Sequence, residues 1–151
     1  MAGKIHQEIV LSRKLPIEVE AFLNVQLTAS ALMSGVATII KPFGLSTTQY
    51  NVLRILRGAG ETGMPCGEVS DRLITRDSDI TRLFDRLEKR GYLTRERSDS
   101  DRRVVRAKIA QPAIDLLDEI DTPMLDLHAK QFQVLSQEDI AKLIDLLEAL
   151  R

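Results

Sequence analysis

The chain has 151 residues, of which 44% are hydrophobic and 28% are charged. These values are typical of a soluble globular domain and exclude a disordered or fibrous chain. A single cysteine, Cys66, excludes an internal disulfide and a cysteine-based zinc cluster. With only two histidines, we expect no metal and no cofactor. The first residues lack a signal-peptide pattern, so the expected location is cytoplasmic.

The net charge of −1 conceals an uneven distribution. Residues 1–44 carry a net charge of +1, residues 45–108 of +4 and residues 109–151 of −6. A locally basic middle segment is the pattern expected of a protein that binds a polyanion such as nucleic acid. A solvated surface of mixed charge would give the same count, so charge alone leaves both interpretations open.

The first predicted element is a long helix from Pro16 to Ile40. No charged residue occurs between Ala21 and Ile40, a length that could span a membrane. Six polar side chains are scattered through this stretch, which a lipid-facing helix rarely carries. We therefore expect no membrane segment, and a helix that protein buries on most sides.

Three shorter helices follow. Ser46 and Gln49 form a capping-box pattern before a helix at about 47–57, with Tyr50, Leu53, Ile55 and Leu56 expected inside. Pro65 is expected to open a helix that reaches Leu73, with Cys66, Val69 and Leu73 on its core face. A helix at about 76–90 has the apolar stripe Ile80, Leu83, Phe84 and Leu87 and ends at Gly91.

Two β-prone runs, 92–97 and 102–109, are joined by a polar turn and predict a hairpin. In its second strand Val105, Ala107 and Ile109 should face the core, because they alternate with charged residues. Helical patterns resume at Gln111, where Pro123 is expected to kink or break the helix. Ser136 and Asp139 cap a last helix.

This order predicts a mainly α fold with a small β-hairpin wing, a winged helix-turn-helix. We expect an N-terminal arm and dimerisation helix (1–44), a DNA-binding domain (45–110) and C-terminal dimerisation helices (111–151). The flanking helices are more apolar than one small domain needs, which favours an intertwined dimer.

Three segments carry a family resemblance. The run from Asp79 to Arg95 resembles the recognition helix and following strand of the MarR (multiple antibiotic resistance regulator) family, and Ser98–Arg103 resembles its wing. Gly44–Leu53 is similar to the opening of its first DNA-domain helix. The resemblance implies a homodimeric, sequence-specific transcriptional regulator that binds a pseudo-palindromic double-stranded DNA operator, and a repressor released by a small ligand. Ala110 and the acidic Asp77 and Asp79 depart from the family pattern.

The polar face of the 76–90 helix supplies the predicted DNA contacts. Base-edge contacts are expected in its N-terminal half and phosphate contacts elsewhere. The base-edge candidates are Ser78, Asp79, Thr81 and Arg82, and the phosphate candidates are Arg76, Arg86 and Lys89. Asp79 serves equally well as a helix-terminus charge. Arg86 serves equally well as a partner of Asp85 or Glu88.

In the wing, Asp101 is placed to orient an arginine, and the resemblance identifies Arg103 as that residue. An arginine held this way suits the narrow minor groove. Arg102, with Arg95 and Arg97 nearby, would complete a basic ridge. A hairpin salt bridge of little energetic value is the alternative.

The resemblance also implies a pocket for a small aromatic or amphipathic ligand, lined by Phe22, Phe43, Tyr50 and His128. His128 is otherwise expected as a core or interface histidine. Cys66 shares a face with core residues, which disfavours a redox role.

The two other classes of function are an enzyme and a module that binds protein. The sequence contains no nucleophile–base pair and no phosphate-binding loop, so we expect no catalytic residues and no enzyme. A winged-helix module that binds protein instead of DNA is the remaining alternative. Such a module has no reason to keep Arg82, Arg86, Arg97, Arg102 and Arg103 on one side.

Overall fold

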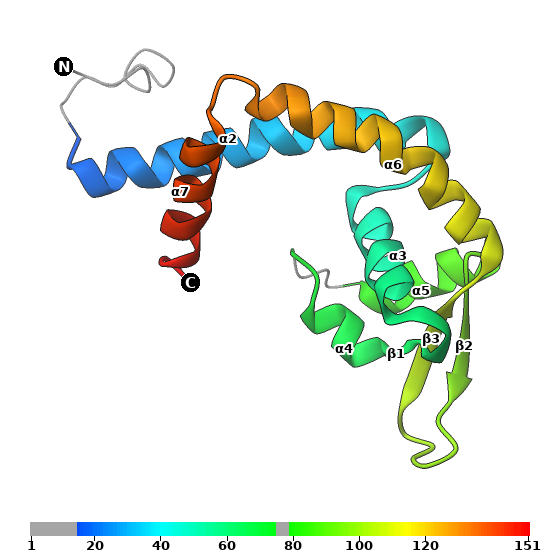
Figure 1. The fold of residues 1–151 in the computed structure, drawn as a ribbon. Coiled ribbons are helices and arrows are strands. Elements are labelled where there is room, and N and C mark those ends of the chain that lie inside the picture. The colour runs from blue at the N-terminus through cyan, green and yellow to red at the C-terminus, as the bar shows by residue number, and fades with distance from the viewer. Residues whose placement is uncertain (1–14, 75–78) are drawn as a thin grey trace. The chain divides into compact units, whose positions relative to one another are not determined.

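The structure, a computed structural model, describes residues 15–74 and 79–151. The chain forms two units, one ending at Val36 and one beginning at Ala37. Helix α2 (Ile17–Ile40) supplies the described part of the first unit, and its last turn belongs to the second (Figure 1). The long helix predicted from the sequence is therefore confirmed.

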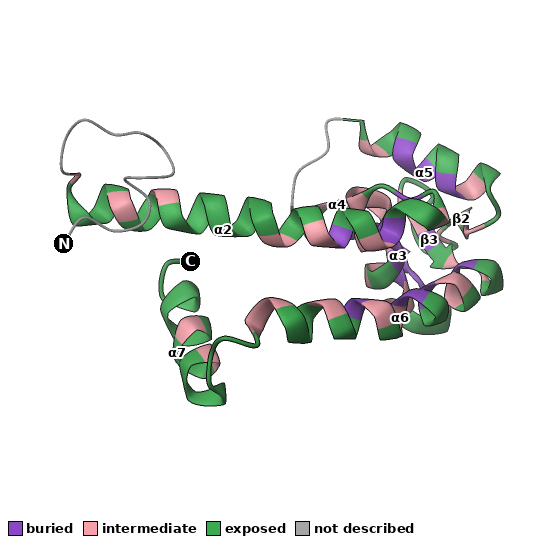
Figure 2. Ribbon diagram, turned by 90° about the horizontal axis from the view of Figure 1, so that it is seen from above, coloured by how far each residue is buried: buried purple, intermediate pink, exposed green. Residues whose placement is uncertain are grey.

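Most apolar residues of α2 are exposed, and Figure 2 colours most of this helix as exposed. Ile17 is 77% exposed and Phe22 is 59% exposed. The prediction that protein buries this helix on most sides is therefore not met by a single chain. The segment Ile17–Phe43 is long and apolar enough to cross a membrane, a test that core helices of soluble proteins also pass.

The second unit contains the remaining elements, and Figure 1 labels its helices and strands. A 3-10 turn (Lys41–Phe43) leads into α3 (Thr47–Ala59), and a second one (Gly60–Thr62) leads into β1 (Met64–Pro65). Then follow α4 (Cys66–Asp71), α5 (Ile80–Lys89), β2 (Leu93–Arg97), β3 (Val105–Ile109), α6 (Gln111–Phe132) and α7 (Gln137–Glu148).

Local sequence signals set several helix ends. At α3 the Ser46 hydroxyl accepts the Gln49 backbone N–H at 3.1 Å, and the Gln49 side chain accepts the Ser46 N–H at 3.0 Å. Ser136 and Asp139 repeat this capping box at α7. Gly91 ends α5 with a φ of 73°, and Tyr92 N–H bonds back to Leu87 C=O at 3.0 Å. These three predicted helix boundaries are confirmed.

The sheet has one strand more than the predicted hairpin. Its order is β1-β3-β2, with both neighbouring pairs antiparallel. The added pairing joins Met64 to Ala107 and Pro65 to Arg106, so Pro65 ends a strand before α4 starts at Cys66. Gly63 makes this approach possible, since a Cβ there would lie 2.3 Å from the Ala107 carbonyl oxygen.

A continuous core joins the helices to the sheet. It includes Leu53 and Leu56 of α3, Leu87 of α5, Leu93 and Ala107 of the sheet, and Leu117 and Ile120 of α6. In the two short helices α4 and α5, Val69, Leu83 and Phe84 are also buried, as predicted.

Among the predicted core positions, Val105 is exposed, and four others are only partly buried: Ile55, Cys66, Ile80 and Ile109. Val52, not Ile55, is fully buried in α3. Val105 is exposed, because it lies at the outer end of β3, beyond the residues of that strand that pair with β1.

Helix α6 runs without interruption through Pro123, so the predicted break does not occur. Proline removes one backbone donor from a helix, and packing on both sides can offset that loss. Ile120 and Met124 are buried on either side of Pro123. At the start of α6, Pro112 occupies the first turn behind Ala110, which makes no side-chain cap.

Candidate nucleic-acid interface

Helix α5 has one apolar face and one basic face. Leu83, Phe84 and Leu87 are buried, so the opposite face must point to solvent. That face carries the exposed residues Thr81, Arg82, Arg86 and Lys89. Among the described residues, neither Arg86 nor Lys89 has an ion pair, so the alternative pairing of Arg86 with Asp85 or Glu88 does not form. The helix therefore presents cations to solvent along its length.

The start of α5 is acidic as well as basic. Asp79 occupies the N-cap position. Its carboxylate lies 3.4 Å from an Arg82 nitrogen, and both side chains are at least half exposed. Arg76, Asp77 and Ser78 lie outside the described residues, so their predicted roles stay predictions.

The wing turn is ordered by Asp101. Its carboxylate accepts the backbone N–H of Arg103 at 3.0 Å, and its carbonyl accepts the N–H of Val104 at 2.9 Å. From the sequence we expected Asp101 to orient an arginine side chain. The contact is made to the backbone of Arg103 and not to its side chain. Asp101 therefore fixes the position of the Arg103 backbone in the turn. Arg97, Arg102 and Arg103 are all exposed.

Arg95 does not belong to the expected basic ridge. Its side chain is 22% exposed and is hydrogen-bonded to two carboxylates of α5. Its Nε and one terminal nitrogen donate to Glu88 at 3.0 and 2.7 Å, and the same nitrogen donates to Asp85 at 2.5 Å. These contacts raise the pKa of Arg95, with Glu88 the main cause. Its charge is therefore used inside the protein.

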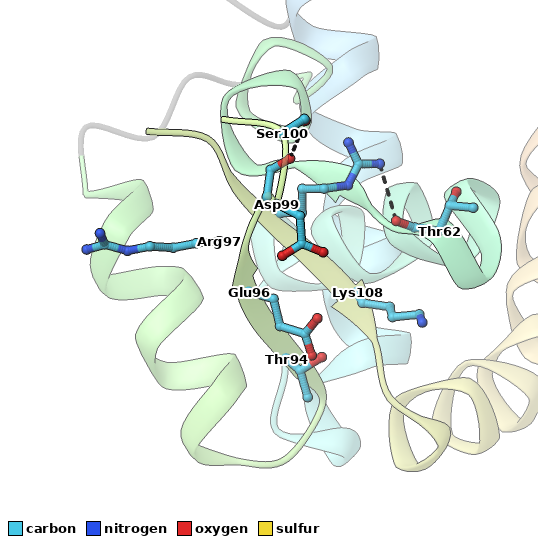
Figure 3. A pocket seen from close by; sticks show the side chains of 9 residues that line it. Thr62, Thr94, Glu96, Arg97, Asp99, Ser100 and Lys108 are labelled. Carbon is cyan, nitrogen blue, oxygen red and sulfur yellow. Dashed lines mark hydrogen bonds between the residues drawn. The ribbon is translucent and has the colours of Figure 1, made fainter. Parts of the chain in front are cut away.

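The other face of the hairpin borders a hollow of about 360 Å³. In Figure 3 the Arg97 side chain points away from Glu96 and Lys108. The guanidinium of Arg106 donates to the carbonyl oxygens of Thr62 and Gly63 at 3.2 and 3.0 Å, and a dashed line in Figure 3 reaches Thr62. Because positive and negative side chains alternate here, this hollow shows no preference for an anion.

A second hollow, of about 290 Å³, lies between α3 and α6. It brings together two of the predicted ligand residues, Tyr50 and His128, as part of a lining made up of Tyr50, Arg54, Arg57, Asp121, Met124, Leu125 and His128. Phe43 does not line it, and Phe22 belongs to the first unit. His128 is exposed, contrary to the core role considered for it, and contacts Gln131 at 3.0 Å.

The chemistry of this second hollow is mixed. Burial raises the pKa of Tyr50, which keeps its phenol protonated as a hydrogen-bond donor near neutral pH. Arg57 makes two 2.8 Å hydrogen bonds to Asp121 that lower the pKa of this carboxyl. Arg54 lies 5.6 Å from the centre of the Tyr50 ring. Among the described residues Arg54 makes no salt bridge, although its charge helps to lower the pKa of Asp121.

Cys66 lies half-buried at the start of α4, and burial raises the pKa of its thiol. A thiol with a raised pKa holds little thiolate at neutral pH, which disfavours oxidant sensing. This agrees with the interpretation of the sequence.

The sequence did not predict the internal contacts of three arginines, one of which, Arg95, it placed in an exposed basic ridge. Besides Arg95 and Arg106, Arg90 donates to the carbonyls of Phe43 and Gly44 and stacks on Tyr92. The only signal for Arg95 was the acidic pair Asp85 and Glu88 beside the basic face of the helix. Nothing in the sequence distinguished Arg90 or Arg106 from solvated arginines.

Comparison with known proteins identifies the family. The MarR family model matches residues 45–105. The HTH-type transcriptional regulator MhqR of Bacillus subtilis is 30% identical over 109 residues, covering 72% of this chain and 74% of that protein.

Two solved structures have the same fold. A MarR transcription factor from Planctomyces limnophilus superposes with a TM-score of 0.67 at 34% identity, over 91% of this chain and 99% of that one. A mutant of Escherichia coli MarR, solved in complex with operator DNA, has a TM-score of 0.79 at 19% identity, over 98% and 99% of the two chains. The sequence match, the winged-helix fold and the basic solvent face of α5 agree, and the chain is a DNA-binding transcriptional regulator that belongs to the MarR family.

Proposed function

We propose that a cytoplasmic homodimer of this chain binds a pseudo-palindromic operator in double-stranded DNA and represses transcription until a small ligand releases it. The observation that carries this proposal is the solvent face of α5, where Arg82, Arg86 and Lys89 are exposed. The opposite face of the helix is apolar and packs into the core. The residues that would read DNA all lie in the second unit.

The N-terminal half of α5 is assigned to the major groove. Arginine paired with guanine is the commonest specific base contact, and a carboxylate can accept from cytosine. Arg82 and Asp79 are therefore the proposed base-reading pair, with Thr81 and Ser78 beside them. Arg76, Arg86 and Lys89 are proposed to hold phosphates, which positions the protein without reading the sequence.

The wing is assigned to the adjacent minor groove. The Asp101 carboxylate holds the Arg103 backbone, which lowers the conformational freedom lost when the arginine enters the groove. Minor grooves that are narrow have an enhanced negative potential that attracts arginine. Arg97 and Arg102 are proposed to contact the flanking phosphates.

Exposed apolar side chains support the homodimer. In the last two helices and the segments that border them, Leu125, Val134 and Leu150 are each more than two-thirds exposed, and α2 exposes Ile17 and Phe22. Apolar patches of this kind mark protein–protein interfaces. Paired subunits would place two recognition helices about 34 Å apart, in successive major grooves.

The second hollow supports ligand control. It offers apolar surface from Met124 and Leu125, a phenol donor at Tyr50 and a cation at Arg54, which together suit a small aromatic or amphipathic molecule. Tyr50 and His128 are the two predicted ligand residues that line it.

Fluorescence anisotropy with the DNA beside the protein's own gene tests the proposal. We expect binding that scrambled competitor DNA does not remove and that weakens steeply with salt. Arg82→Ala should lower affinity by about tenfold or more and relax sequence preference, and Arg103→Ala should lower it similarly. Lys142→Ala on α7 is the matched control and should change affinity less than about twofold. Equal affinity for scrambled DNA would refute the proposal.

A further inference from the structure

The recognition helix and the wing are joined by one arginine. Its partners Asp85 and Glu88 lie in the second and third turns of α5, and Arg95 lies in the middle of β2. We call these three residues the Arg95 clamp. We propose that the Arg95 clamp positions the wing relative to the recognition helix, so that both reach DNA together; this inference rests on the proposed function.

The geometry of the clamp fixes an orientation as well as a distance. Glu88 accepts the Arg95 backbone N–H with one oxygen at 3.0 Å and the Arg95 side chain with the other. One carboxylate therefore holds both the strand and the side chain of Arg95. Paired bonds between guanidinium and carboxylate are stronger and more directional than single neutral hydrogen bonds. A rotation of β2 relative to α5 would break these bonds together.

The clamp lies between the residues that the proposed function assigns to DNA. Arg86 and Lys89 flank Glu88 on α5, and Arg97 follows Arg95 by two positions on the same face of β2. Arg97 in turn leads into the wing turn that holds Arg103. The path from recognition helix to minor-groove residue is therefore continuous through the clamp.

The charge of the clamp has a second consequence. Two carboxylates on a DNA-binding helix would repel phosphate if they faced it unpaired. Arg95 neutralises part of that charge while it remains largely withdrawn from solvent. Positioning and simple repulsion consequently give opposite expectations for the removal of Glu88.

The substitution Glu88→Gln separates these two expectations. Repulsion alone predicts tighter DNA binding, because the variant loses a negative charge. The clamp predicts weaker binding, on the order of tenfold, because the amide has a single acceptor oxygen and cannot hold both the backbone N–H and the side chain of Arg95. Glu96→Gln removes the same charge from an exposed residue of β2 that has no partner among the described residues. It should leave affinity unchanged or slightly tighter.

Arg95→Lys is the second variant. It keeps the charge of the protein but cannot form the guanidinium fork. The clamp predicts weaker DNA binding for this variant also. The slope of log affinity against log salt concentration should change by less than the value for one phosphate contact, because no DNA-contacting cation is removed. Thermal unfolding of each variant shows whether the fold is intact.

A double-mutant cycle with Arg103→Ala distinguishes positioning from general structural damage. If the clamp acts through the wing, Glu88→Gln should cost much less affinity once Arg103 has been removed. The inference is overturned if Glu88→Gln binds as well as or better than the unsubstituted protein, or if its cost is the same in both backgrounds. If the unsubstituted protein does not bind DNA sequence-specifically, the proposed function is refuted, and the inference with it.

Discussion

The substitution Gly63→Ala should destabilise the protein strongly. Gly63 has a φ of +62° and a ψ of −166°, a region that only glycine adopts without strain, at a cost of about 1–3 kcal/mol for other residues. The new Cβ would lie 2.3 Å from the carbonyl oxygen of Ala107 and 3.3 Å from the Cα of Lys108. Both atoms belong to the backbone of β3, the central strand, and cannot rotate away.

Relief of this clash would separate β1 from β3. The Arg106 hydrogen bonds to Thr62 and Gly63 would weaken with it, at about 1 kcal/mol each. Together with the backbone strain, the expected loss of unfolding free energy is about 3–5 kcal/mol.

Urea unfolding at fixed protein concentration measures this loss, since a dimer's stability depends on concentration. Gly58→Ala is the matched control. Gly58 lies in α3, where a Cβ meets nothing within 4 Å, so the helix should gain about 0.5–1 kcal/mol. The reasoning is refuted if Gly63→Ala unfolds within about 0.5 kcal/mol of the unsubstituted protein.

Three further outcomes are expected. The lowered pKa of Asp121 means that its contribution to stability is present above the ordinary aspartate pKa and is lost as the pH falls through the folded value. As the pH is lowered, the free energy of unfolding in urea should therefore fall less steeply for Asp121→Asn than for the unsubstituted protein. An equal fall in the two proteins would contradict the role of Arg57. Ser46→Ala removes the α3 capping box and should cost about 1 kcal/mol in the same assay, whereas Ser100→Ala in the wing turn should cost less. Sedimentation should give twice the chain mass of 16.9 kDa, and Phe22→Asp should shift the protein toward a single chain; a monomer at all concentrations would exclude the proposed interface.

The sequence was sufficient to predict features that depend on residues close together in the chain. The capping boxes at Ser46 and Ser136 and the helix end at Gly91 each rest on a few adjacent positions, and all three were predicted. The apolar stripe of α5 could also be predicted, because apolar residues that recur with a period of 3.6 indicate a buried helix face. These signals place α5 and the wing hairpin.

The sequence was insufficient where partners lie on different elements. The two-residue strand β1 is defined by its pairing with β3, so no pattern in the neighbouring sequence predicts it. Arg95 looks like any solvated arginine until α5 and β2 pack together and Glu88 comes within hydrogen-bonding distance, at 2.7 Å. The exposed apolar faces of α2 and α7 likewise have no explanation within one chain.

Selection from a pool of random double-stranded DNA tests the central claim most directly. The purified protein is incubated with the pool, and the bound duplexes are sequenced. The account predicts enrichment of a pseudo-palindrome whose half-sites are centred about one helical turn apart, and loss of base preference within each half-site for Arg82→Ala. Bound DNA without any common sequence would contradict the assignment of α5 as a base-reading helix.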